Sequence, residues 1–404
     1  MDKKWTVKDF PIGLYNLHPD KSISFQMNRF FNFSNDIEMM EEMKLAGASI
    51  HSYDDFVKSF VDLGKKSLEK DEKLRAAFYF RGAEFFLPEN NPQKQTLRSQ
   101  FISLNNAYYG VTKKQHYLIP YENGFLSAYR FTPKAPKGTV VFVAGFDGYI
   151  EEVFRWLLVF RDAGYDTIIF DGPGQGSVLE DYHIPMTNEW EKPVKVLFDY
   201  FNLDNVTVIG TSLGGNLALR AAAYEARIKR VICFDILPDF FAVVMRQFPD
   251  NLKDKLKELI FNKEGKEEIN AKISQLMQKS FMLQWACTQG MHVMGSSSPY
   301  EFLQKCTLYN TDDFSQLIKQ DVLLLAGQED HYVPIEQLTE QISTLTNVHS
   351  LTARMFTAKE FASNHCQLGN IGLAFSVMLN WIEQISLSSA SLNAEHRKKT
   401  SASI

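Results

Sequence analysis

The sequence has no long apolar run, and its first residues lack the continuous apolar stretch of a signal peptide. A membrane-spanning helix needs about 20 consecutive apolar residues, and no segment reaches that length. We therefore expect neither a secretory leader nor a membrane span. Both absences favour a cytoplasmic location.

Cysteine is also scarce. The chain has four cysteines, and no two of them form a CxxC pair. Scattered cysteines are typical of a reducing compartment. The nine histidines add no zinc-ligand spacing, so we expect no metal and no cofactor. The cysteines are Cys233, Cys287, Cys306 and Cys366.

Neither positively nor negatively charged residues are in large excess. Lys and Arg number 43 against 48 Asp and Glu, which gives a net charge of −5 and a pI near 6.0. This balance gives no reason to expect nucleic acid or an anionic membrane as a partner. The expected partner is a small apolar or aromatic molecule, and a homodimer of the chain is left open.

The 404 residues are 45% hydrophobic and 23% charged, which is an ordinary globular composition. This length has room for one large domain with additions or for two domains.

The sequence of the first part, 1–112, predicts a helical domain because nothing in it alternates like a strand. Three ranges carry apolar residues at helical spacing: 52–70 with Ser52 as N-cap, 71–87, and 92–110, which Gly110 ends.

Strands and helices alternate in the next part, 113–386, as expected for βαβ units around a mainly parallel sheet. Asn123-Gly124 marks a hairpin between the first two strands. A helical insertion rich in Met and aromatic residues interrupts the pattern at about 238–299. The polar segment 387–404 predicts a disordered tail. Further strands are expected near 138–145, 165–171, 205–210, 230–235, 320–327 and 349–356.

The segment Gly210-Thr211-Ser212-Leu213-Gly214 fits G-x-S-x-G between a predicted strand and a predicted helix. The small residues let strand and helix come close while the serine adopts a strained conformation that exposes its hydroxyl. This motif is the nucleophile elbow of α/β-hydrolases. We predict that Ser212 is a catalytic nucleophile.

A nucleophilic serine needs a base, and the base needs an orienting carboxylate. In this fold the acid precedes the histidine along the chain. Asp330 lies just after a buried strand and is preferred as the acid, with the adjacent Glu329 as the alternative. His365 lies between the last strand and the last helix, and we predict that it is the base.

The oxyanion donors should be the N–H groups of Phe146 and Leu213, because the second donor comes from the loop after the third strand. Asp147 either holds this loop at the substrate-binding site or is a simple turn residue. The glycine-rich segment 171–176 follows a strand but lacks the lysine of a P-loop, so we expect a tight turn and no nucleotide there.

The helical insertion is a candidate lid whose Met and aromatic residues line an apolar pocket. Met245, Met282 and Trp285 are the candidates, although such residues are as often ordinary core. The two roles are compatible if one face packs and another lines the site.

With these residues in place, the chain resembles the α/β-hydrolase superfamily, with an N-terminal helical domain and a helical lid. It is similar to the group of 2,6-dihydroxypseudooxynicotine hydrolase, the yellowish-green-type polyketide-shortening hydrolases and the fermentation-respiration switch proteins. The resemblance rests on "FQMNRFF", "RAAFYFRGAEFF", "GFDGYIEE", "DGPGQG", "GTSLGG", "GQEDHYVP" and "SNHCQ".

The resemblance implies a triad of Ser212, Asp330 and His365 in a site between two domains. It implies hydrolysis of a carbon–carbon bond next to a ketone, or trimming or release of a polyketide chain. An acidic residue beyond the strand after the elbow sometimes assists in this group, which makes Asp235 or Asp239 a candidate. A carboxylesterase or thioesterase is the first alternative, and a hydrolase-fold binding or regulatory protein is the second.

Overall fold

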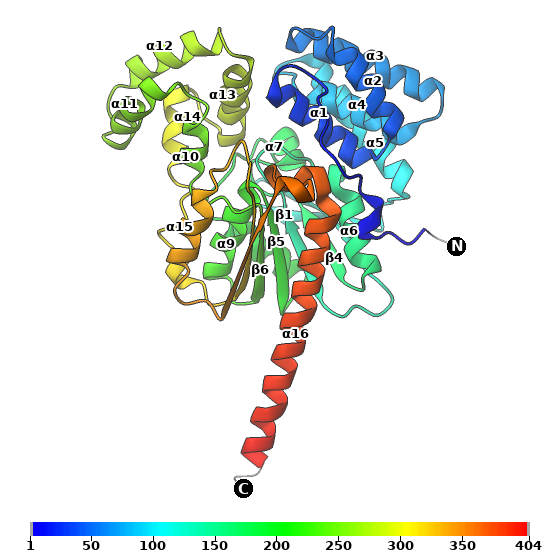
Figure 1. Cartoon of the computed structure of the whole chain (residues 1–404), viewed down its shortest axis with the longest axis vertical. Coiled ribbons are helices and arrows are strands. Elements are labelled where there is room, and N and C mark those ends of the chain that lie inside the picture. Colours follow the sequence, from blue (N-terminus) through cyan, green and yellow to red (C-terminus); the bar gives the residue numbers. More distant parts are fainter. Residues whose placement is uncertain (1–2, 402–404) are drawn as a thin grey trace.

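The computed structural model describes residues 3–401, without the side chains of 281, 282 and 388–401. In this part of the chain, a sheet of eight strands in the order β1-β2-β4-β3-β5-β6-β7-β8 forms the centre of the molecule (Figure 1). β1 and β2 are antiparallel, and β3 to β8 run parallel. The strands are β1 His116–Tyr121, β2 Gly124–Phe131, β3 Thr139–Val143, β4 Asp166–Phe170, β5 Val206–Thr211, β6 Ile228–Phe234, β7 Asp321–Gly327 and β8 Ser350–Phe356.

The α/β-hydrolase fold predicted from the sequence is confirmed. The strands lie where apolar runs predict them. The hairpin turns at Glu122 and Asn123, one residue before the expected Asn123-Gly124, because Gly124 already pairs with Tyr121. Helices cover both faces of the sheet (Figure 1). They are α6 Phe154–Asp162, α7 Gly176–Tyr182, α8 Glu191–Phe201, α9 Leu213–Tyr224, α15 Glu336–Thr344 and α16 Ile371–Ser401.

The N-terminal helices form a layer over the carboxyl ends of the parallel strands. Ser52 caps α3 by accepting from the Asp55 N–H, and Gly110 ends α5 with φ +64°, both as predicted. Two helices that the pattern analysis does not name, α1 and α2, precede them. The bounds are α1 Lys21–Ser34, α2 Ile37–Gly47, α3 Tyr53–Glu69, α4 Lys73–Phe85 and α5 Pro92–Tyr109.

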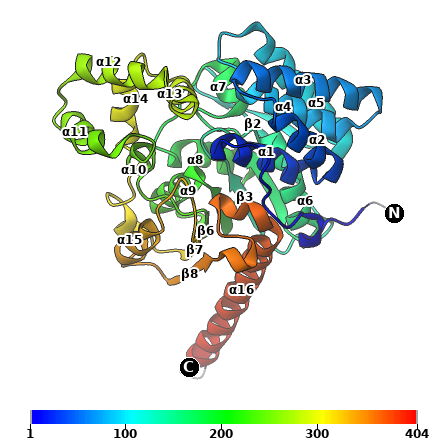
Figure 2. The same ribbon diagram turned by 45° about the horizontal axis from the view of Figure 1, so that its top comes forward.

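A second group of helices lies beside this layer, over the same edge of the sheet (Figure 2). It corresponds to the candidate lid and extends beyond the expected limit near 299, to Cys306. The helices are α10 Phe240–Met245, α11 Asp250–Phe261, α12 Lys266–Met277, α13 Phe281–Met294 and α14 Pro299–Cys306. No helix among the described residues is both long and apolar enough to cross a bilayer.

The segment 387–404, expected to be disordered, is helical in the structure as far as Ser401, where α16 ends. This stretch contains Ala, Leu, Glu, Lys and Arg, which are good helix formers, so the helix continues past the last buried turn. The final turns of α16 project beyond the body of the molecule (Figure 1).

One apolar core joins the N-terminal helices to the sheet. It runs from Phe30, Phe60 and Phe78 of the helical layer through Phe142 of β3 to Phe375 of α16, and all of these side chains are fully or almost fully buried. A second core on the other face of the sheet includes the lid helices. The N-terminal helices therefore share their core with the hydrolase part.

Candidate active site

Ser212 lies in the turn between β5 and α9, with φ +58° and ψ −125°. A positive φ is strained for a residue with a Cβ atom, and such strain is concentrated at functional sites. The flanking glycines make the turn possible. A Cβ atom on Gly210 would lie 1.9 Å from the carbonyl oxygen of Gly214, and one on Gly214 would lie 2.4 Å from that of Val143. The sequence motif thus reflects close backbone packing around Ser212.

The structure brings the three predicted triad residues together. Nε2 of His365 lies 2.8 Å from Oγ of Ser212, and Nδ1 of His365 lies 2.6 Å from Oδ2 of Asp330. Because a carboxylate only accepts, Nδ1 of His365 carries the donated proton and Nε2 is free to accept one from Ser212. The alternative acid, Glu329, instead accepts a hydrogen bond from Ser363 at 2.7 Å.

Asp330 is fixed by its own turn. Its Oδ1 accepts from the backbone N–H groups of Tyr332 at 2.7 Å and Val333 at 2.9 Å. Burial raises the pKa of Asp330, but the charge and hydrogen bond of His365 outweigh it, so the pKa of Asp330 is lowered. Burial lowers the pKa of His365, and Asp330 reverses this and holds that pKa well above its usual range.

Asp235 does not line the active-site cavity, contrary to the expectation that it binds substrate. It follows β6 directly and lies behind the triad, where its Oδ2 accepts from the Cys366 N–H and from Nε2 of Gln367, both at 3.1 Å. Burial, together with the charge of Asp330, raises the pKa of Asp235 well above its usual range. Asp235 therefore supports the loop that carries His365, through its hydrogen bonds with Cys366 and Gln367.

The ligand-type atoms of Asp235, Asp330 and His365 lie within 4.8 Å of one another, the spacing of a metal site. However, Nδ1 of His365 and Oδ2 of Asp330 already bond each other, and Oδ2 of Asp235 accepts from the following loop. This geometry fits a hydrogen-bonded triad with a supporting carboxyl group.

The predicted oxyanion donors lie next to Ser212. Leu213 is the first residue of α9, where a backbone N–H has no acceptor within the helix. Phe146 belongs to the loop that follows β3, and this loop passes against the nucleophile. A Cβ atom on Gly145 would lie 3.2 Å from Cβ of Ser212. Both Phe146 and Leu213 line the cavity.

We call residues 144–149 the oxyanion loop. On one side it is held by Gln175, whose Nε2 donates to the carbonyl oxygens of Ala144 at 2.7 Å and Gly145 at 2.9 Å. Gln175 belongs to the glycine-rich segment 171–176, which forms a turn as expected and leads into α7. This turn thereby supports the active site.

A buried cluster of charged side chains holds the other side of the oxyanion loop. Arg81 donates to the carbonyl oxygen of Asp147 at 2.7 Å and to Oε1 of Glu152 at 2.7 Å. Arg29 donates to Oδ1 of Asp147 at 2.9 Å and to Oε2 of Glu152 at 2.8 Å. Burial raises the pKa of Glu152, but the two arginines outweigh it and keep it ionised. The buried ion cluster consists of Arg29, Arg81, Glu84, Lys94, Asp147 and Glu152.

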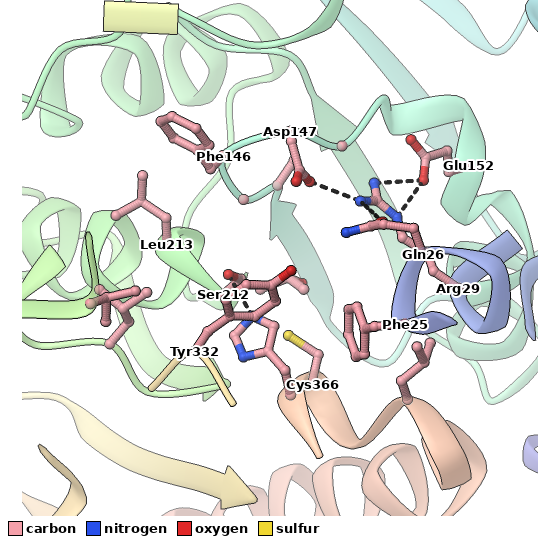
Figure 3. Close-up of a pocket in the computed structure, with 18 of the residues that line it drawn as sticks. Phe25, Gln26, Arg29, Phe146, Asp147, Glu152, Ser212, Leu213, Tyr332 and Cys366 are labelled. Carbon is pink, nitrogen blue, oxygen red and sulfur yellow. Dashed lines mark hydrogen bonds and ion pairs between the residues drawn. The ribbon is translucent and has the colours of Figure 1, made fainter. Parts of the chain in front are cut away.

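A cavity of about 210 Å³ opens beside Ser212 and His365 (Figure 3). Three parts of the chain form its walls. The N-terminal helix α1 contributes Phe25 and Phe33, the hydrolase part contributes the oxyanion loop, and the lid contributes Phe240 and Trp285. Most of the wall is apolar, so the cavity fits an apolar substrate.

The candidate lid residues differ in position. Trp285 lines the cavity and stacks on Phe85 of α4, with ring centroids 4.7 Å apart. Its Nε1 also donates to the carbonyl oxygen of Phe85 at 3.1 Å, which ties the lid to the N-terminal helices. Met245 is buried in the core instead, because it lies on the face of α10 that points away from the cavity. The side chain of Met282 lies outside the described residues.

The two other acidic candidates also differ. Asp147 lines the cavity from within the oxyanion loop, directly after Phe146. Asp239 instead caps α10 by accepting from the Ala242 N–H at 3.0 Å. Sequence reasoning missed Gln26, Arg29 and Tyr332, which also line the cavity.

The comparisons with known proteins agree with this architecture. The family model of the α/β-hydrolase fold matches residues 138–362. The hydrolase acrC of Aspergillus aculeatus is 25% identical over 351 residues, which cover 77% of this chain and 80% of that protein. The 20-hydroxy-prefusarin hydrolase FUS2 of Gibberella moniliformis is 25% identical over 344 residues, covering 77% and 79%.

Solved structures give the same fold. The 2,6-dihydroxy-pseudo-oxynicotine hydrolase aligns with a TM-score of 0.55 and 18% identity, covering 82% of this chain and 88% of that one. AbyA5 aligns with a TM-score of 0.58 and 12% identity, covering 80% and 84%. Because the family model spans more than half of the chain and the strand order and nucleophile turn agree with it, this protein belongs to the α/β-hydrolase-fold family.

Proposed function

We propose that the protein is a serine hydrolase that cleaves an apolar carbonyl compound through an acyl-enzyme on Ser212. One observation carries this proposal: a strained serine, a histidine and a carboxylate are joined by hydrogen bonds of 2.8 and 2.6 Å at the mouth of an apolar cavity.

The chemistry follows from the positions of these groups. Ser212 attacks the substrate carbonyl while Nε2 of His365 takes its proton, and Asp330 stabilises the resulting imidazolium. The N–H groups of Phe146 and Leu213 donate to the oxyanion that forms. His365 returns the proton to the leaving group, and water then releases the acyl group by the same steps in reverse.

We favour cleavage of a carbon–carbon bond next to a ketone. The substrate would be an aryl ketone or a polyketide-like compound, and the reaction would be simple hydrolysis or the trimming or release of a polyketide chain. The mostly apolar cavity wall supports an apolar substrate. The resemblance to 2,6-dihydroxypseudooxynicotine hydrolase and the polyketide-shortening hydrolases supports the bond type, and the relatives acrC and FUS2 are both named hydrolases.

A carboxylesterase or thioesterase is the second candidate, because the same triad and oxyanion donors serve an ester. A pure binding or regulatory role is a weaker alternative, since it needs no hydrogen-bonded chain of Ser212, His365 and Asp330.

A fluorophosphonate probe and the Ser212→Ala variant test the proposal. We expect the probe to label the native protein and not the variant, and we expect the variant to lose on the order of 10⁴ to 10⁶ in kcat with an unchanged circular dichroism spectrum. Substrates would be p-nitrophenyl esters of rising chain length and aryl 1,3-diketones, with products identified by mass.

Ser343→Ala is the matched control, because Ser343 is exposed on α15 and bonds only the Glu340 carbonyl oxygen. Labelling and turnover that survive in Ser212→Ala would show that another residue performs the reaction.

A further inference from the structure

Polar side chains from three segments lie together in one part of the mostly apolar cavity wall (Figure 3). Gln26 and Arg29 come from α1, Asp147 from the oxyanion loop, and Tyr332 from the loop that carries Asp330. We call these four residues the polar corner. Arg29 and Asp147 hold the oxyanion loop, but an apolar substrate alone gives no reason for Gln26 and Tyr332 to line its binding site.

Arg29 and Asp147 are held rigidly within the polar corner. The Arg29 guanidinium binds Oδ1 of Asp147 at 2.9 Å and Oε2 of Glu152 at 2.8 Å, and it contacts Oε1 of Gln26 at 3.4 Å. Within the buried ion cluster, the positive charges of Arg29, Arg81 and Lys94 are matched by carboxylates. The corner therefore has no excess charge to attract an ionic substrate, and it suits a neutral molecule with an oxygen atom.

Tyr332 points its ring into the same space. Its ring lies edge-on to His365, with centroids 5.1 Å apart, and edge-on to Phe25 at 5.7 Å. Burial, with a further contribution from the charge of Asp147, raises the pKa of Tyr332. The hydroxyl group therefore keeps its proton and is available as a hydrogen-bond donor, with the amide of Gln26 facing its oxygen.

The polar corner lies directly beside the oxyanion hole. Asp147 follows Phe146, and consecutive Cα atoms are about 3.8 Å apart. Tyr332 lines the same cavity as Phe146 and Leu213, and its ring centroid lies 5.1 Å from that of His365, so an oxygen atom bound at the corner shares the cavity with the oxyanion. Two carbonyl oxygens separated by one carbon atom, as in a 1,3-dicarbonyl compound, match such a pair of neighbouring sites.

The chemistry of carbon–carbon cleavage needs a second site of this kind. When an ester is cleaved, an alkoxide leaves and the oxyanion hole suffices. When a 1,3-diketone is cleaved, the electron pair of the broken bond moves to the carbon between the carbonyls and onto the second oxygen as an enolate. Hydrogen bonds to a charged oxygen are stronger than those to a neutral one, so donors at this position favour the cleavage step.

We propose that the polar corner binds the second carbonyl oxygen of a 1,3-dicarbonyl substrate with an apolar body, and that the Tyr332 hydroxyl donates to the enolate that leaves. Oγ of Ser212 forms the bond to the first carbonyl carbon, the bond to the central carbon breaks, and the proton held by His365 passes to that carbon. Water then hydrolyses the acyl-enzyme, so that one diketone and one water give a carboxylic acid and a ketone. This inference rests on the proposed serine hydrolase function.

The test compares two reactions of one protein. The rates of cleavage of 1-phenylbutane-1,3-dione and of p-nitrophenyl butyrate are measured for the native chain and for Tyr332→Phe. We expect the ratio of diketone to ester kcat/KM to fall about 10- to 100-fold in the variant, the loss typical of a hydrogen bond to a charged group. Tyr224→Phe, a change at an exposed tyrosine remote from the cavity, is the matched control and should leave the ratio as it is.

A binding measurement separates recognition from chemistry. In the Ser212→Ala background, we expect the diketone to bind about tenfold more tightly than butyrophenone, which has the same phenyl group and one carbonyl. Addition of Tyr332→Phe should abolish that preference. An unchanged rate ratio in Tyr332→Phe, or an equal loss on both substrates, would overturn the inference.

The two proposals fail in different ways. A native protein that reacts with the fluorophosphonate probe and cleaves esters, but never diketones, would overturn the role of the polar corner and leave the serine hydrolase intact. A protein that does not react with the probe and cleaves neither substrate would overturn both.

Discussion

The pKa values of His365 and Asp330 are shifted in opposite directions by their hydrogen bond. Burial lowers the pKa of His365, but the charge of Asp330 outweighs it and raises that pKa well above 6.5. A base must be neutral to accept the Ser212 proton. We therefore predict that kcat/KM for a neutral ester rises with pH as His365 loses its proton, with a midpoint above pH 6.5. This midpoint reports the pKa of His365 in the free enzyme.

Asp330→Asn should lower kcat by about 10⁴ and move this acid limb to lower pH, because burial then acts on His365 without the opposing charge. A pH profile of kcat/KM for both proteins checks the shift. Glu329→Gln is the neighbouring control and should leave the profile in place, since Glu329 bonds Ser363. A larger loss in Glu329→Gln than in Asp330→Asn would refute the assignment of the acid.

The sequence was sufficient to predict that Ser212, Asp330 and His365 come together, because each lies in the connection that follows a strand whose place in the topology is fixed by chain order. It could not predict which side of a helix or loop faces the cavity. Met245 and Asp235 were therefore misplaced, and Tyr332 was missed although it lies two residues from Asp330. These orientations depend on packing between segments far apart in the chain.

At the scale of elements, the oxyanion loop is held between the turn at 171–176 and α4 of the N-terminal layer. Arg81 contacts the Asp147 carbonyl oxygen, Glu84 and Glu152 at once, using the fork of donors that only arginine has. Lysine keeps the charge but cannot span three acceptors. We predict that Arg81→Lys lowers kcat about tenfold with little change in KM, because a displaced Phe146 N–H stabilises the transition state less.

Arg75→Lys is the matched control for this prediction. Arg75 lies on the same helix, is similarly buried, and pairs with Asp36 and Glu38 inside the N-terminal layer. Steady-state kinetics and thermal unfolding of both variants separate the two roles. If Arg81→Lys and Arg75→Lys changed kcat equally, or if Arg81→Lys changed only KM, Arg81 would have no special influence on the oxyanion loop.

The helices differ in how clearly the sequence alone predicts them. In α4 every residue from Leu74 to Phe85 is buried, so the helix has no polar face, although it carries Arg75, Arg81 and Glu84 among apolar residues. Charged residues in an otherwise apolar helix are a sign in the sequence of buried ion pairs. The helix α1 was missed because its aromatic residues surround it on several sides, and only contact with the core explains them.

At the scale of the whole molecule, the cavity is closed by three parts that contact one another. Trp285 of the lid stacks on Phe85 of α4, and the lid residue His292 lies 2.9 Å from Glu89 and 3.2 Å from Glu180. Burial lowers the pKa of His292, but the two carboxylates outweigh it and raise that pKa. The lid and the N-terminal layer are thus linked by a stacked pair and an ion pair around the substrate space.

The N-terminal layer is also part of the apolar core. Its aromatic side chains, among them Phe30 and Phe78, form one cluster with Phe142 of β3 and Phe375 of α16. Removal of the layer would expose this apolar face of the hydrolase part to water and leave Glu152 without Arg29 and Arg81. Exposed apolar surface costs about 25 cal/mol per Å² in lost burial. We predict that residues 113–404 expressed alone do not form a stable soluble monomer.

Gel filtration, circular dichroism and fluorophosphonate labelling of the 113–404 fragment check this expectation, with the full chain as reference. Co-expression of 1–112 should restore labelling, because both pieces then supply the shared core and the charges that hold the oxyanion loop. A fragment that is monomeric, labels at the native rate and cleaves esters as fast as the full chain would show that the helical layer is dispensable. The oxyanion loop would then be held by Gln175 alone, and the role assigned to Arg81 would fall with it.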